Sequence, residues 1–158
     1  MSLNIVNENQ DELKAYVRNK MFEYNMKHFP DDLKGRYQEV HLFLKDTHAR
    51  VCGGVLGEIC WNWLEIQYLF IEPEYRGSGY GRKLMQAIER IARDKQCDFI
   101  KTDTLSFQAL DFYTKEGFEV YGIIENAGRH THYYLKKLLN TIESDYTRDR
   151  PLPASEGS

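Results

Sequence analysis

Residues 65–82, with the sequence EIQYLFIEPEYRGSGYGR, constrain the possible folds of this chain more than any other stretch. The run Leu69–Ile71 is continuously apolar, which is typical of a strand buried on both faces. Pro73 cannot donate a hydrogen bond to a sheet, so we expect the strand to end before it. A tight turn and a close approach of the backbone to a ligand are then favoured by three glycines, Gly77, Gly79 and Gly81.

From Gly81 onward the pattern changes to that of an amphipathic helix. Its apolar face carries Leu84, Met85, Ile88, Ile91 and Ala92, and its polar face carries Lys83, Gln86, Glu89, Arg90 and Arg93. The first turn of a helix leaves backbone N–H groups without partners, and here they follow a glycine-rich loop flanked by Arg76 and Arg82. This combination favours the binding of a phosphate group.

Two common phosphate-binding loops fit these residues poorly. A P-loop requires Gly-Lys-Ser/Thr at its end, whereas Gly81 is followed by Arg82 and Lys83. A dinucleotide-binding loop requires the spacing G-x-G-x-x-G and an acidic residue at the end of a second strand, whereas Asp98 starts an expected strand. An ordinary glycine-rich connection between a strand and a helix is the remaining alternative.

Composition narrows the class of protein. The chain has 158 residues, of which 42% are hydrophobic and 28% charged, as is typical of one globular domain. A net charge of -3 argues against a broad nucleic-acid surface. The sequence contains no apolar run of membrane-spanning length and no leader-like apolar segment at its start, so we expect no membrane association. Three cysteines without a C-x-x-C pair favour free thiols and a cytoplasmic location.

Hydrophobic periodicity predicts a single α/β domain at residues 1–139, followed by a polar tail at 140–158 whose end, 148–158, we expect to be disordered. The expected helices are 9–27, a helix from Gly81 to a turn at Gln96, and 107–116, the last closed by Gly117. The expected strands are 2–7, 37–45, 51–61, 63–71, 99–104, 118–124 and 130–139. Loops or turns separate them, among them 28–36 and 126–128.

The order of these elements and two motifs resemble the GNAT superfamily of N-acetyltransferases. The first motif, LFIEPEYRGSGYG at residues 69–81, is similar to the strand-and-loop signature of that family. The second, Ala109-x-x-Phe112-Tyr113-x-x-x-Gly117-Phe118, is similar to its second helix and following strand. The likeness covers residues 37–138 and implies a mixed, mostly antiparallel central sheet of about six to seven strands, flanked by helices and splayed at the CoA-binding strand.

The resemblance implies an enzyme that transfers an acetyl group from acetyl-CoA to a primary amine of a small molecule or peptide, by direct attack in a ternary complex. It implies that the strand end binds the pantetheine arm, that the glycine-rich loop binds the pyrophosphate, and that the strands part after Ile71. The cofactor-binding residues so implied are Leu69, Phe70, Ile71, Arg76, Gly77, Ser78, Gly79, Tyr80, Gly81, Arg82, Ser106, Ala109 and Phe112. Ser106 stands where many members carry asparagine.

The resemblance also implies two catalytic residues. Tyr113 occupies the position of the family's general acid, and a departing thiolate needs such a donor; the alternative is a packed aromatic ring. Glu65 lies where the histone-acetylating branch carries its glutamate base, and partial burial would raise its pKa toward neutrality. A solvent-facing glutamate is the alternative there, and deprotonation through water needs no single base. Further candidates near the amine are Glu58, Gln67 and Glu72.

Other readings of the chain stay open. His130 and His132 lie on one strand face, but without a third ligand we expect a solvent-facing or substrate-facing strand and no metal. The glycine loop also fits a non-catalytic acyl-CoA-binding module or a nucleotide-binding α/β domain. The resemblance further suggests a homodimer.

Overall fold

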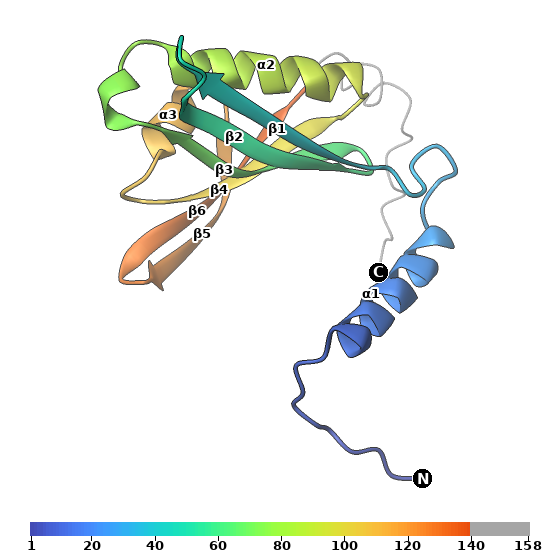
Figure 1. Ribbon diagram of the computed structural model, residues 1–158. Helices are drawn as coiled ribbons and strands as arrows, with labels where there is room; N and C mark the ends of the chain where they lie inside the picture. The colour runs from blue at the N-terminus through green and yellow to red at the C-terminus, as the bar shows by residue number, and fades with distance from the viewer. Residues whose placement is uncertain (140–158) are drawn as a thin grey trace, which may run out of the picture. The chain divides into compact units, whose positions relative to one another are not determined.

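The computed structural model describes residues 1–139, and the chain divides into two compact units. The first unit is Met1–Gly35 and contains α1 (Asp11–Met26); the second begins at Arg36 (Figure 1). The second unit contains β1 (Tyr37–Lys45), β2 (Val51–Cys60), β3 (Trp63–Ile71), the short 3-10 helix η1 (Pro73–Tyr75), α2 (Tyr80–Asp94), β4 (Phe99–Leu105), α3 (Leu110–Lys115), β5 (Glu119–Ala127) and β6 (His130–Leu138).

The strands form one six-stranded sheet in the order β1-β2-β3-β4-β6-β5. All neighbouring pairs in this sheet are antiparallel except β3 and β4, which are parallel. Antiparallel strands can be joined by short turns, such as Trp61–Asn62, whereas a parallel step needs a crossover, which α2 supplies. The predicted fold class, a mixed and mostly antiparallel sheet flanked by helices, is confirmed.

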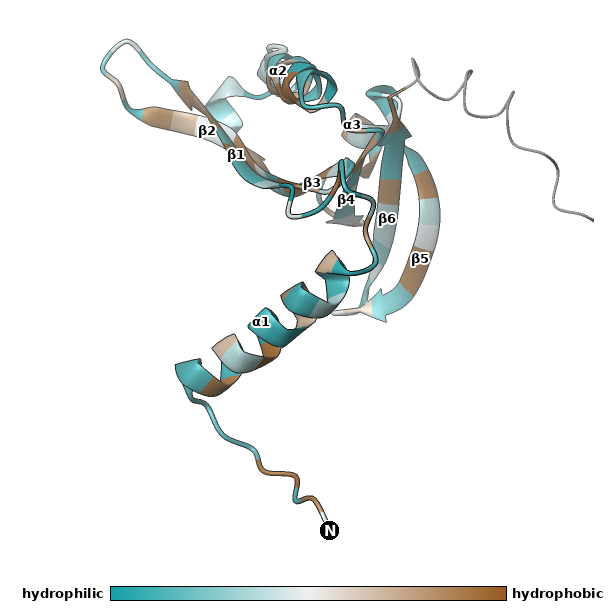
Figure 2. Cartoon of the chain, turned by 90° about the vertical axis from the view of Figure 1, so that its right-hand side faces the viewer, coloured by the Kyte–Doolittle hydropathy of each residue, from teal (hydrophilic) through white to brown (hydrophobic). Residues whose placement is uncertain are grey.

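The core lies between α2 and one face of the sheet. The apolar side chains of α2 recur at helical spacing, so Leu84, Met85, Ile88 and Ala92 are each 4% exposed or less. They join a cluster of equally buried strand residues that includes Val55, Ile59, Leu64, Ile66, Ile100 and Leu135. Figure 2 views α2 nearly end-on above the strands. Each of these large side chains contributes about 1.5–3 kcal/mol through burial, and together they fix α2 on the sheet.

A register shift in β3 controls where the sheet opens. β3 and β4 pair over only three positions, from Trp63–Phe99 to Glu65–Lys101. Directly beyond, the register of β2 and β3 shifts between Leu56 and Gly57, so β3 carries an extra residue there. An extra residue bends its strand and increases its twist, and β3 leaves β4 at this point. The expected separation after Ile71 is therefore wrong, because the strands part directly after Glu65.

Several boundaries differ from the sequence-based expectations. The strand expected at 2–7 is absent, since residues 1–10 form neither helix nor strand. A strand needs a paired neighbour to satisfy its backbone groups. β5 reaches Ala127, so the turn before β6 is at 128–129 rather than 126–128. The expected end of the tail, 148–158, lies outside the described residues.

The helix expected at 107–116 starts only at Leu110. Side chains hold the preceding residues in a turn instead. The Gln108 side-chain oxygen accepts a hydrogen bond from the Leu105 N–H at 2.7 Å, and the Thr104 hydroxyl accepts one from the Ala109 N–H at 3.2 Å. Such local side-chain bonds compete with the helical backbone pattern, so α3 keeps only six residues.

Candidate active site

A cleft of about 930 Å³ lies where β3 and β4 part. The end of β3, η1 and the start of α2 form one wall, and β4, the loop after it and α3 form the other. Of the binding residues predicted from the sequence, those that border the cleft are Leu69, Phe70, Ile71, Arg76, Gly77, Gly79, Tyr80, Gly81, Arg82, Ser106, Ala109 and Phe112. Ser78 and Glu65 are not among the bordering residues.

The glycine-rich loop delivers the start of α2 to the cleft. Gly79 precedes the first turn of α2 with φ 86°, a left-handed conformation that favours glycine. No side chain of the described residues caps this end, so the first N–H groups of α2 are available to a ligand. A Cβ atom at Gly81 would lie 3.0 Å from the Phe112 ring. The missing side chain therefore lets α3 approach α2 closely.

Two arginines flank this loop. The Arg76 Nε donates to the Ile71 carbonyl at 2.7 Å, and its guanidinium lies 5.3 Å from the centre of the Phe70 ring. The Arg82 Nε lies 3.9 Å from a Glu116 carboxylate oxygen, and its side chain is 72% exposed. The two cations and the positive end of the α2 dipole give this end of the cleft the character of an anion site.

Tyr113, on α3, also borders the cleft. It is 3% exposed, and its ring packs edge-on against Phe112 and Phe118. Burial raises the pKa of Tyr113, hydrogen bonding with the Thr102 hydroxyl opposes this rise, and the negative charge of Asp103 adds to it. A tyrosine with a raised pKa keeps its proton at neutral pH and can donate it.

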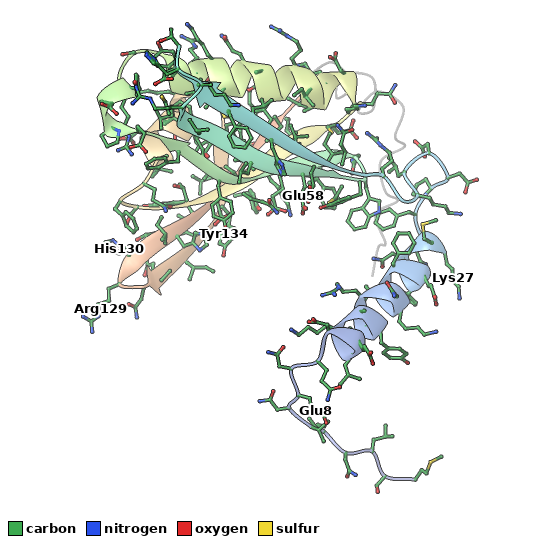
Figure 3. All side chains as sticks on the ribbon, in the orientation of Figure 1. Glu8, Lys27, Glu58, Arg129, His130 and Tyr134 are labelled. Atoms are coloured by element: carbon green, nitrogen blue, oxygen red, sulfur yellow. The ribbon has the colours of Figure 1, made fainter. Side chains whose placement is uncertain are left out.

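Glu65 lies beside the opening rather than in it. It occupies the last paired position of β3, opposite Glu58 on β2 and Lys101 on β4. Its carboxylate lies 3.9 Å from the Lys101 Nζ, and its side chain is 35% exposed. Strand alternation places Glu65 on the face turned away from α2, the face on which Figure 3 shows Glu58. Glu65 is thus at the point where the strands part, with Lys101 as its ion-pair partner, and its catalytic role stays a prediction.

β4 and the loop after it supply polar groups that the sequence analysis did not single out. The Thr102 hydroxyl donates to the Ile66 carbonyl at 3.1 Å and so bridges the two strands where they part. Asp103, Thr104 and Gln108 also border the cleft. The available signal was the polar run after Ile100 in a strand that follows the glycine loop, but only the sheet order brings it opposite Gln67–Ile71.

Comparison with known proteins connects this geometry to a family. The model of the acetyltransferase (GNAT) family matches residues 5–118, well over half of the chain. The chain belongs to the GNAT family of acetyltransferases. A crystal structure of an acetyltransferase from Bacillus cereus superposes with a TM-score of 0.81 and 34% identity, covering 86% of this chain and 98% of that one.

Two curated proteins are also similar to this GNAT chain. Acetyltransferase Atu2258 of Agrobacterium fabrum is 29% identical over 111 residues, which are 70% of this chain and 79% of that protein. Blasticidin-S acetyltransferase of Streptomyces morookaense is 31% identical over 93 residues, 57% of this chain and 68% of that protein. The chain is therefore an N-acetyltransferase that transfers an acetyl group from acetyl-CoA to an amine. In the described part of the chain no helix has the length and apolar character to cross a membrane.

Proposed function

We propose that acetyl-CoA occupies the cleft between β3 and β4, and that a primary amine of a small molecule or peptide attacks its thioester directly in a ternary complex. The observation that carries this proposal is the polarity of the cleft. The cleft is bordered by Arg76 and Arg82 around the start of α2, by the apolar end of β3 and by the buried Tyr113. Acetyl-CoA has three parts that suit these borders, which are a pyrophosphate, an extended arm and a reactive thioester.

The binding roles follow from these contacts. The first N–H groups of α2 and the side chains of Arg76 and Arg82 bind the pyrophosphate, since anions are stabilised at a helix N-terminus and by paired cations. β3 lacks a partner strand beyond Glu65 on the side of β4. Apart from the Ile71 carbonyl, which accepts a hydrogen bond from Arg76, the backbone groups of Leu69–Ile71 that face β4 can therefore hydrogen-bond the amides of the pantetheine arm, as an added strand does.

Tyr113 acts as the general acid. A thiolate leaves the acetyl group when the new amide forms, and a nearby donor lowers the free energy of this step. The hydroxyl is at the cleft, and burial raises its pKa, so it remains protonated. Glu65 is the base implied by the resemblance, with deprotonation through water as the alternative. Its position beside Lys101 keeps it on the face from which an amine can approach the opening.

Turnover of acetyl-CoA by the full chain tests this function. We expect thiol release with at least one member of a panel containing blasticidin S, L-lysine, spermidine and a tripeptide with a free N-terminus. Blasticidin S is included because one relative is named for it. Arg82→Ala should weaken acetyl-CoA binding, whereas Arg90→Ala, an exposed arginine farther along α2, should not. Tight binding of acetyl-CoA without turnover on every amine contradicts the proposal and favours a non-catalytic acyl-CoA-binding module.

The location and assembly of the chain stay predictions. The cytoplasm suits the three free cysteines, Cys52, Cys60 and Cys97. A homodimer is suggested by the resemblance alone, and the mass of the protein in solution measures it.

A further inference from the structure

His132 and Asp103 form a pair beside the cleft that none of the roles above uses. The His132 Nε2 lies 2.7 Å from the Asp103 Oδ2, joining β6 to β4. Asp103 borders the cleft, whereas His132 is not among the bordering residues and lies on the neighbouring strand, β6. The two side chains are 22% and 45% exposed, so the pair is partly shielded and still reachable by a substrate.

The pairing fixes which nitrogen of His132 can accept a proton. A carboxylate only accepts hydrogen bonds, so Nε2 carries the hydrogen that points to Asp103, and the lone pair of the neutral ring is on Nδ1. Within the described residues 36–139, Nδ1 of His132 has no hydrogen-bond partner. The Tyr134 ring packs against the imidazole with 4.4 Å between ring centroids and limits its rotation. Figure 3 shows Tyr134 on the same hairpin as His130, nearer to the rest of the sheet.

This pair lies across β4 from Tyr113. Thr102 and Thr104 are 4% and 3% exposed and face the core with Tyr113. Alternation along β4 directs Asp103, between them, to the opposite face. The charge of Asp103 nevertheless contributes to the raised pKa of Tyr113, so the two groups are within electrostatic range. Tyr113 and the His132–Asp103 pair therefore lie on opposite faces of β4.

We propose that His132 accepts the proton of the acceptor ammonium and that Asp103 is its positioning residue. This inference rests on the proposed function. Transfer of one ammonium proton to Nδ1 leaves a neutral amine, whose lone pair forms the N–C bond to the acetyl carbon. The C–S bond breaks, and the thiolate takes a proton from Tyr113. The second proton of the amine nitrogen restores Tyr113, and His132 releases the first to solvent, so one proton is produced per turnover.

The surroundings of His132 suit an imidazolium. The titratable groups on this face include Asp103 and Lys101 of β4, Glu65 of β3, Tyr121 of β5, and His130, Tyr134 and Lys136 of β6. Burial raises the pKa of Tyr121, and the charges of Glu65 and Asp103 add to this rise, so Tyr121 stays neutral. Lys101 is paired with Glu65, which leaves Asp103 to balance a positive charge on His132.

The kinetics of four variants, measured with the panel amine of highest turnover, test this assignment. They are His132→Ala, Asp103→Asn, His130→Ala and Glu65→Gln. His132→Ala should lower kcat about 100-fold or more, with unchanged KM for acetyl-CoA, and added imidazole should restore part of the activity. The acid limb of the kcat/KM profile should disappear in His132→Ala, because this variant lacks the group whose protonation would block the reaction. Asp103→Asn should lower kcat about tenfold or more without rescue by imidazole. His130→Ala, two residues away on the same face, should keep kcat within about threefold.

Glu65→Gln separates the two candidate bases. A larger loss of kcat in His132→Ala, with rescue by imidazole, than in Glu65→Gln supports the inference. Retained kcat in His132→Ala together with a large loss in Glu65→Gln overturns it and leaves the proposed function intact. Loss without rescue and with an unchanged acid limb also overturns it, because that pattern indicates a structural role. No turnover by the unmodified chain on any panel amine contradicts the proposed function and this inference with it. Stabilisation of each variant by acetyl-CoA in thermal melting verifies that it is folded.

Discussion

Removal of the Tyr113 hydroxyl is the sharpest test of the assigned chemistry. Tyr113→Phe deletes one oxygen and keeps the ring contacts with Phe112 and Phe118. The Thr102 hydroxyl keeps its hydrogen bond to the Ile66 carbonyl, so no buried group is left without a partner. Loss of the hydrogen bond between the Tyr113 and Thr102 hydroxyls costs about 0.5–1.5 kcal/mol of folding free energy. The variant should therefore fold and bind acetyl-CoA as the unmodified chain does.

The effect on turnover should be much larger than the effect on stability. A positioned general acid contributes about 100-fold or more to the rate, which corresponds to about 2.7 kcal/mol of activation free energy. Burial raises the pKa of Tyr113 above its ordinary value, so ionisation of the acid lowers kcat only above about pH 10. Between pH 7 and about pH 10, the kcat of Tyr113→Phe should be lower than that of the unmodified enzyme by a constant factor of roughly 100.

The assay is thiol release at saturating acetyl-CoA, followed across pH with the best panel amine. Tyr37→Phe is the matched control. Tyr37 lies on β1 and does not border the cleft, and its hydroxyl donates a hydrogen bond to a Glu58 oxygen at 3.0 Å. The control should keep kcat within about threefold. A Tyr113→Phe enzyme that also stays within about threefold at every pH would refute the acid role and return Tyr113 to a packing role.

Two further predictions concern binding and thiol reactivity. Arg76→Ala should raise the KM for acetyl-CoA about tenfold or more, because the variant loses a charge-assisted contact with the pyrophosphate worth about 1.5–3 kcal/mol. The rise in KM should be smaller at high salt. An unchanged KM contradicts the phosphate-binding role of Arg76. Burial, then the charge of Glu58, raises the pKa of Cys60 to about 11, so Cys60 should react slowly with iodoacetamide at pH 8 and faster as the pH approaches 11. Glu58→Gln should lower this pKa and speed the reaction at pH 9, whereas Glu39→Gln should not, as mass spectrometry of each cysteine can measure; equal rates in the two variants contradict the electrostatic cause.

Local patterns predicted the elements whose stability depends on their own residues. The helix after Gly81 follows from its apolar spacing, and four of its five predicted apolar residues are buried. The strands at 37–45 and 63–71 have the expected bounds, because alternation and the breaks at Asp46 and Pro73 are encoded locally. The start of α3 was missed because the side chains of Thr104 and Gln108 close a turn, which propensity does not reveal.

The residues of the candidate site likewise fall into those that local sequence predicted and those that it did not. The residues of the glycine loop are contiguous, so their shared position at the cleft could be expected from the sequence. His132 and Asp103 are 29 residues apart, and their contact depends on the pairing of β4 with β6 and on its register. No local pattern encodes that register. The point at which β3 leaves β4 likewise depends on an extra residue that shows only in the pairing with β2.

The short parallel ladder between β3 and β4 has a consequence for how this protein reaches its fold. β1-β2-β3 is a meander of neighbouring strands and β5-β6 is a hairpin, so the contacts within these two groups close small loops. The β3–β4 ladder closes a loop of 36 residues through α2 and forms only three residue pairs. β4 joins β6 across a loop of similar length to the β3–β4 loop, but over seven residue pairs. Because closing a longer loop costs more chain entropy before contacts repay it, docking of the two groups through α2 should limit the folding rate. Mutations at the α2 core positions should therefore slow refolding, whereas mutations in the β5–β6 hairpin should mainly speed unfolding.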